Sequence, residues 1–165
     1  MKSIILILLF GLLTTSVHSQ QNYIYIGSQQ FEATSTWVFY TPSANSPGSI
    51  ELSVAKTKNG GYLMLEVGVP VENLEIAGIV SMILQNGKLI TLNQKVVNDH
   101  VDSKSKVLYT LNATNYSLLK VYNIKKIRFS IYDTWMRSTE SFTASIREYD
   151  GNETAEEISE LEDIY

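Results

Sequence analysis

Hydrophobic and polar residues alternate along most of the chain after about residue 20, and this pattern predicts β-strands. Tyr23–Ile26 is rich in aromatic and β-branched residues and ends at Gly27, and the similar run Thr36–Tyr40 is followed by Pro42. In Ile50–Ala55, large hydrophobic residues alternate with smaller or polar ones. Such alternation is typical of a strand with one buried face in an antiparallel sheet.

Two Asn-Gly pairs predict β-hairpins. Asn59-Gly60 connects the strand just described to Tyr62–Val67, and Asn86-Gly87 connects Ile79–Leu84 to Lys88–Leu92. A type I′ turn needs positive φ at both central residues, which Asn and Gly tolerate best. We therefore expect two antiparallel hairpins that turn at these pairs.

Beyond the hairpins, the pattern predicts a loop, a strand and one short helix. The polar segment Asn98–Ser103 is expected to loop across an edge or end of the sheet, and a strand is expected from Lys106 to Thr110. Hydrophobic spacing then changes over about residues 112–122, where a helical stripe is expected with Asn112 or Thr114 as N-cap and a stop at Asn123.

Two more strands are expected after the helix, and together these elements define the fold class. One is a strongly hydrophobic strand marked by Ile124, Ile127, Phe129 and Ile131. The other, Ser141–Arg147, places Phe142, Ala144 and Ile146 on one face. The chain is therefore predicted to be mainly β, as an antiparallel sandwich or a curled sheet with one short α-helix; an α+β fold is the alternative.

The N-terminus has the features of a secretory signal peptide. Lys2 precedes the hydrophobic run Ile4–Leu13, and Val17 and Ser19 stand at the positions that a signal peptidase reads. The run is shorter than the roughly 20 residues of a membrane span, so cleavage near Ser19 is expected, with no stable membrane insertion afterwards. The predicted organisation is a signal peptide at residues 1–19, one β-rich domain at 20–150 and an acidic, mobile tail at 151–165.

Composition narrows the compartment and the partners. The chain contains no cysteine, which excludes disulfides and thiolate chemistry and favours bacterial export to the periplasm or the medium. Removing the leader leaves 12 basic and 17 acidic side chains. Because nucleic-acid binders rely on a basic surface, no nucleic-acid partner is expected. No cofactor-binding motif is present, and no cofactor is expected.

Several short segments resemble a group of small, uncharacterised exported proteins from Bacteroidetes-type bacteria. They are the leader and residues 61–65, 83–90, 99–105, 108–111 and 123–131. The resemblance covers most of the mature chain and implies a bacterial origin and export. It implies no activity.

Candidate catalytic and metal-binding residues gather around one histidine. His100 is the only histidine after the leader, and an extended segment would place Asp102 on the same side as its ring. Asp99 and Asp102 could also contribute oxygen ligands to a metal ion, although two or three ligands do not make a site. A small hydrolase centred on His100 with Asp99 or Asp102 is thus one hypothesis, and a solvated polar loop is its alternative.

Aromatic residues favour a different function. Asp133, Trp135 and Arg137 are expected in one loop, where they could form a recognition patch, unless Trp135 caps the core as many loop tryptophans do. Trp37 lies within a strand and is expected in the core. The function that the sequence favours is an exported, non-catalytic β-domain that binds a glycan, a peptide or a partner protein. A structural or inhibitory periplasmic protein that offers strand edges to a partner is the remaining alternative.

Overall fold

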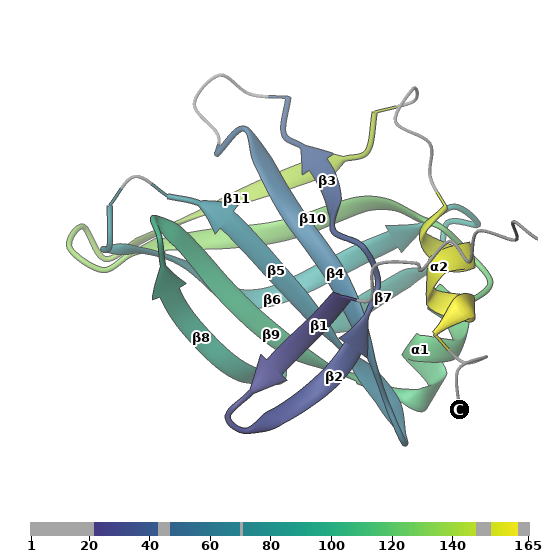
Figure 1. Cartoon of the computed structure of the whole chain (residues 1–165). Coiled ribbons are helices and arrows are strands. Elements are labelled where there is room, and N and C mark those ends of the chain that lie inside the picture. The colour runs from purple at the N-terminus through teal and green to yellow at the C-terminus, as the bar shows by residue number, and fades with distance from the viewer. Residues whose placement is uncertain (1–21, 43–46, 70, 148–152, 162–165) are drawn as a thin grey trace, which may run out of the picture.

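The computed structural model describes residues 22–42, 47–69, 71–147 and 153–161, and these residues form eleven antiparallel strands and two short helices (Figure 1). The predicted signal peptide lies outside the described residues. The elements are, in chain order, β1 Asn22–Ile26, β2 Gln29–Ala33, β3 Trp37–Tyr40, β4 Ser49–Thr57, β5 Gly60–Gly68, β6 Leu74–Leu84, β7 Leu89–Leu92, β8 Lys95–Val101, β9 Lys104–Asn112, α1 Ala113–Leu119, β10 Ile124–Asp133, β11 Ser138–Ser145 and α2 Thr154–Glu160.

The strands form one curled antiparallel sheet, which confirms the predicted fold class. Its order is β7-β6-β10-β11-β3-β4-β5-β9-β8, and the β1–β2 hairpin joins through β4. Side chains bridge the seam where the curl brings β6 back towards β8 and β9. Ser105 Oγ accepts from the Ile76 amide at 2.9 Å, and Lys95 Nζ and the Tyr109 hydroxyl donate to the Ile76 and Gly78 carbonyls at 2.8 and 3.1 Å. Burial raises the pKa of Tyr109, so this hydroxyl stays protonated as a donor.

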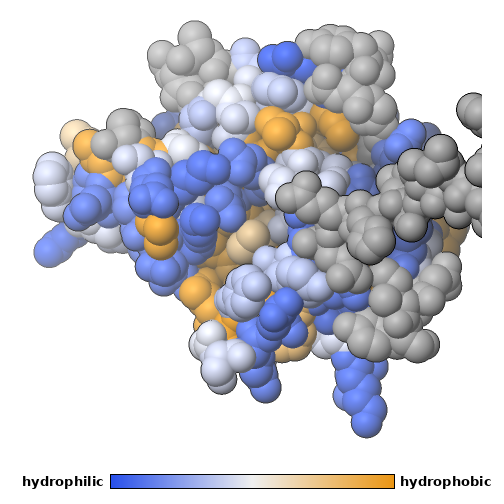
Figure 2. Space-filling model, viewed as in Figure 1, coloured by the Kyte–Doolittle hydropathy of each residue, from blue (hydrophilic) through white to orange (hydrophobic). Residues whose placement is uncertain are grey.

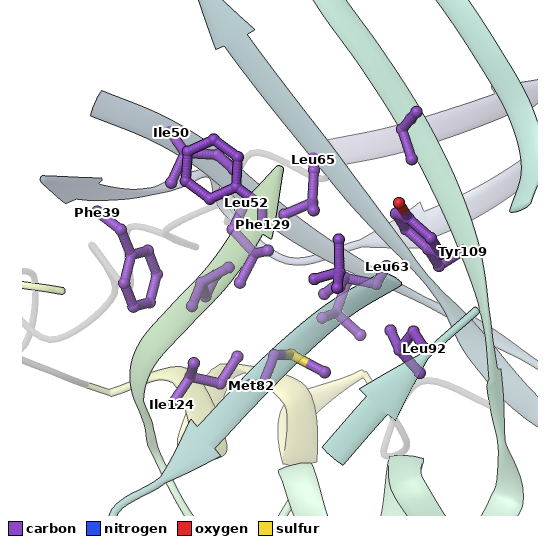
Figure 3. Close-up of a cluster of buried hydrophobic side chains, with 14 of the residues drawn as sticks. Phe39, Ile50, Leu52, Leu63, Leu65, Met82, Leu92, Tyr109, Ile124 and Phe129 are labelled. Carbon is purple, nitrogen blue, oxygen red and sulfur yellow. The ribbon is translucent and has the colours of Figure 1, made fainter. Parts of the chain in front are cut away.

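The interior of the curled sheet is filled by inward-facing hydrophobic side chains (Figure 3). Phe39, Leu63, Met82 and Phe129 are completely buried there. Trp37 belongs to the same cluster, as its position in a strand predicted. Each such side chain contributes about 1.5–3 kcal/mol relative to an exposed one. Most of the stability of the fold therefore comes from this interior.

The β1–β2 hairpin packs on the outer face of the sheet. Ile24 and Ala33 form a second, smaller cluster with Ala55 of β4 and Leu108 of β9. Strand β2 is absent from the sequence prediction because Gln29–Ala33 lacks the β-branched composition by which strands are recognised. It forms because the hairpin covers an apolar part of the sheet that would otherwise face solvent.

Both predicted Asn-Gly hairpins form, but their turns are not of type I′. Positive φ falls on the glycines alone, 137° at Gly60 and 83° at Gly87, and neither Asn59 nor Asn86 has positive φ. A Cβ atom at Gly60 would overlap the Leu111 carbonyl oxygen. Glycine is therefore required at position 60 by the close approach of β9 as well as by its dihedral angle.

The expectation of a loop at Asn98–Ser103 is wrong. β8 extends to Val101, and a two-residue turn at Asp102 and Ser103, with φ of 51° and 59°, leads directly into β9. Polar residues are tolerated in β8 because it is an edge strand with most of its side chains exposed. A turn with positive φ at two successive residues thus forms at Asp102-Ser103 and not at the Asn-Gly pairs.

Helix α1 confirms the predicted N-cap. The Asn112 side chain accepts a hydrogen bond from the Asn115 amide at 2.8 Å, and the helix ends at Leu119, three residues before the expected end.

Helix α2, in the segment expected to be a tail, packs against the domain. Thr154, Ile158 and Leu161 are buried, and Thr154 Oγ1 accepts from the Ile124 amide at 2.9 Å. The N-cap residue is Glu153, and its side chain makes no cap hydrogen bond. Docking of Ile158 into the core orders a segment that its acidic composition alone would leave in solvent.

The two helices lie together at one end of the curled sheet, whereas the tip of the β10–β11 hairpin lies at the other end (Figure 1). At the helical end, Glu157 accepts hydrogen bonds from the Ser35 amide at 3.1 Å, the Ser35 hydroxyl at 2.6 Å and Trp37 Nε1 at 2.8 Å. Neither helix has the length and apolar character that a bilayer crossing requires. Hydrogen bonds to the Glu157 carboxylate thus hold α2 against the sheet at the helical end.

Candidate functional site at the open end of the sheet

A cavity of about 400 Å³ lies at the end of the sheet opposite the helices. This size is within the range of about 300–1,000 Å³ that is usual for small-ligand pockets. Apolar side chains and a few polar ones line it: Pro47, Gly68, Val69, Leu74, Ile131, Asp133, Met136, Ser138, Glu140 and Phe142. The arrangement fits a ligand that is held by apolar contact and oriented by a few polar groups.

One wall of the cavity is the paired face of β10 and β11, which changes from apolar to polar towards the rim. Phe142 faces Phe129 in the core, with their ring centroids 5.7 Å apart. Nearer the rim, Ile131 pairs with Glu140 and Asp133 with Ser138. Because cross-strand partners project from the same face of a sheet, these side chains form a graded wall.

Asp133 fixes the conformation of the hairpin tip. Its Oδ1 accepts three hydrogen bonds at 2.9 Å each, from the amides of Trp135 and Met136 and from Asn73 Nδ2. The Met136 amide bond, then the Asn73 bond and the Trp135 amide bond, hold the pKa of Asp133 below its usual value. Arg137 closes the turn with a φ of 53°. The tip is therefore held in one conformation by an ionised carboxylate.

Trp135 and Met136 project from this tip into solvent, with 80% and 78% of their surfaces exposed. Large hydrophobic side chains held rigidly in solvent are characteristic of binding surfaces. The predicted patch of Asp133, Trp135 and Arg137 thus shares one turn, but only Asp133 lines the cavity. Trp135 does not cap the core, which was the alternative expected from the sequence.

The sequence did not reveal Ser138 and Glu140 as site residues. Both precede the predicted strand Ser141–Arg147, whereas β11 begins at Ser138. The signal was the two-residue spacing of Ser138, Glu140 and Phe142, which places them on one face of a strand. It would have been recognised if the predicted strand had begun three residues earlier.

The cavity and its surroundings are rich in hydrogen-bond acceptors. Asp133 and Glu140 are the charged residues of the lining, and both are acidic. Asn73, which directly precedes Leu74 of the lining, is only 8% exposed, and its buried Oδ1 has no hydrogen-bond partner among the described residues. A buried acceptor without a donor costs about 1–3 kcal/mol, so a donor that reaches it would be stabilising.

The residues around His100 do not adopt the arrangement expected for a catalytic pair. The expectation required His100 and Asp102 on one extended segment, but Asp102 has a φ of 51° and belongs to the turn. Asp99 Oδ1 instead accepts from the His100 backbone amide at 2.8 Å. Among the residues that the structure describes, no group of three or more His, Asp or Glu side chains is arranged to hold a metal ion.

A smaller concavity of about 130 Å³ lies on the outer surface. Its walls come from β1, β5, β8 and β9 and include Tyr25, Met64, Val97 and Leu108. Figure 2 shows hydrophobic atoms at the surface between β8 and the β1–β2 hairpin. With about a third of the volume of the cavity at the open end, it is the weaker candidate for a ligand site.

The chain was compared with protein-family models, with curated proteins and with solved structures, and none of them matches it.

Proposed function

We propose that the protein is an exported, non-catalytic binding domain that recognises a glycan, a peptide or a partner protein at the open end of its curled sheet. Export rests on the N-terminal leader, and binding rests on the site. The observation that carries the proposal is the pairing of a ligand-sized cavity with the exposed Trp135 and Met136 on a turn fixed by Asp133.

The exposed hydrophobic side chains and the ordered hairpin tip support this function, because neither is needed for folding. Keeping two large hydrophobic side chains in solvent brings no folding stability, and the three hydrogen bonds to Asp133 reduce the freedom of the tip that carries them. A tip that is already ordered loses little further entropy when it binds, which raises affinity. No comparable observation favours a hydrolase centred on His100.

The proposal is tested by screening the purified mature chain on glycan and peptide arrays, with pull-down from the native cell envelope for protein partners. Trp135→Ala should weaken binding of the best ligand about 10-fold or more, since aromatic hot spots contribute about 2 kcal/mol or more. Val121→Ala is the matched control, because Val121 is 65% exposed and follows α1 at the helical end. Equal binding by both variants would contradict the proposal.

A second variant distinguishes the proposed binding domain from a hydrolase centred on His100. His100→Ala should leave ligand binding and the fold unchanged if the domain is non-catalytic. Turnover of a bound ligand that is abolished by His100→Ala would contradict the proposed function.

A further inference from the structure

The charged lining of the cavity at the open end has one sign. Among the described residues that line it, the ionisable side chains are Asp133 and Glu140, which are both carboxylates, and none is Lys, Arg or His. Ser138 adds a hydroxyl on the same wall. Within the described residues neither carboxylate takes part in an ion pair, whereas Glu51 and Glu66 on the sheet are paired with lysines. The cavity therefore carries negative charge that its own side chains do not neutralise.

Hydrogen bonding leaves part of this charge available. All three hydrogen bonds to Asp133 end on Oδ1, so Oδ2 has no partner in the described part of the chain. The same bonds keep this carboxyl ionised well below neutral pH, because they lower its pKa. A ligand with several N–H donors would meet Asp133 Oδ2, the Glu140 carboxylate and the Ser138 hydroxyl along one rim.

The deeper part of the cavity is apolar, so the part of a ligand that enters it should be hydrophobic. Val69, Ile131 and Phe142 form this part, and Phe142 also packs on Phe129 of the core. Apolar contact contributes about 25 cal/mol for each Å² removed from water. A ring or branched chain of a few carbons fits the volume of about 400 Å³ together with one polar group.

On these grounds, and resting on the binding function proposed above, we propose that the cavity takes a primary ammonium group attached to an apolar body. The ammonium lies between Asp133 and Glu140 at the rim, and the apolar body lies against Ile131 and Phe142. Two sources carry this chemistry: the amino terminus of a peptide that begins with an apolar residue, and a small hydrophobic amine. Anionic ligands are repelled by the rim, and neutral sugars leave its charge uncompensated.

The test is a titration of the ¹⁵N-labelled mature chain, followed by NMR, with probes that share one apolar body. 2-Phenylethylammonium should shift the amides of Val69, Ile131 and Phe142 and bind about 10-fold more tightly than 2-phenylethanol, a ratio that corresponds to about 1.4 kcal/mol. 3-Phenylpropionate should bind less tightly than the alcohol. The dipeptide phenylalanyl-glycine amide and its N-acetyl form distinguish the two sources. Only the dipeptide with the free amino terminus should bind. It should bind more tightly than 2-phenylethylammonium if a peptide is the natural ligand.

Matched variants localise the effect. Glu140→Gln and Asp133→Asn each remove one charge while keeping the shape, and the amide introduced by Asp133→Asn retains an Oδ1 acceptor for the turn. Each should weaken the ammonium probe about three-fold or more without changing the alcohol, as expected for a partly exposed charge pair. Glu156→Gln, on the exposed side of α2, removes the same charge at the helical end and should change neither probe.

Equal affinity for the ammonium and the alcohol, tightest binding of the carboxylate, or shifts that gather away from the cavity would each overturn the inference. So would the absence of binding by every probe. These results leave the proposed function standing if Trp135→Ala still weakens a ligand found on the arrays. Failure of that variant to affect any array ligand would instead remove the proposed function.

Discussion

Each end of the curled sheet carries a tryptophan, which is buried at the helical end and exposed at the open end. At the helical end, Trp37 is 8% exposed and its indole N–H donates to Glu157 of α2. At the open end, Trp135 is 80% exposed on a turn that Asp133 holds. Both ends use a carboxylate to fix structure, but only the helical end uses it to cover a ring. The difference shows that the ring contributes to the folded core at the helical end, and it supports the proposal that the open end binds a ligand.

Replacing Trp37 by alanine at the helical end should cause the largest loss of stability. The variant loses a buried ring and leaves Glu157 without one of its donors, and we expect the free energy of unfolding to fall by about 3–5 kcal/mol. Urea denaturation followed by circular dichroism measures this change. A loss below about 1 kcal/mol would show that the helical end is not part of the stable core.

Glu157→Ala tests the tie between α2 and the sheet. It removes three hydrogen bonds to a charged acceptor, and we expect a loss of about 1.5–3 kcal/mol in the same experiment. Glu156→Ala is the control, since its exposed side chain should change stability by no more than about 0.5 kcal/mol. Equal effects of the two variants would mean that α2 docks through its apolar face alone.

Asp133 makes the order of the hairpin tip depend on pH. Because its pKa is lower in the folded protein than in the unfolded chain, its contribution is complete above the unfolded value of about 3.9 and is lost as the pH falls through the folded value. The amide NMR shifts of Trp135 and Met136 should therefore change together as the pH is lowered, with a midpoint below the pKa of an ordinary aspartate. Asp133→Asn should abolish this step. A midpoint at or above about 3.9 would contradict the hydrogen-bonded turn.

The smallest effect on stability is expected at the open end. Trp135→Ala removes an exposed ring, and the free energy of unfolding should change by no more than about 0.5 kcal/mol. Thermal unfolding of this variant beside Trp37→Ala gives the comparison directly. A large loss of stability would mean that Trp135 packs against the fold, and the recognition surface would then lose its main side chain.

The sequence predicted well those features that local pattern determines. Alternating residues identified most strands, Asn112 was recognised as the N-cap of α1, and the strand position of Trp37 predicted its burial. Features that depend on distant contacts were missed. Strand β2 forms because it covers Ala55 and Leu108, and α2 forms because Ile158 enters the core. Neither contact can be recognised from the residues near it in the chain.

The site was predicted only in part, for a similar reason. Asp133, Trp135 and Arg137 are close in sequence and were recognised as one group, whereas the cavity combines residues from distant parts of the chain. Val69 follows β5, Leu74 begins β6, and Phe142 lies on β11. The curl of the sheet brings these segments together, and the spacing of hydrophobic residues does not encode that curl.

Iodide quenching of Trp135 tests most directly whether the open end is the recognition surface. The chain has two tryptophans, so a Trp37→Phe variant leaves Trp135 as the sole indole fluorophore. Its fluorescence should be strongly quenched in the free protein and protected when the best array ligand is bound at saturation. Quenching that stays unchanged at saturation would contradict the account, because the ligand would then bind elsewhere on the molecule.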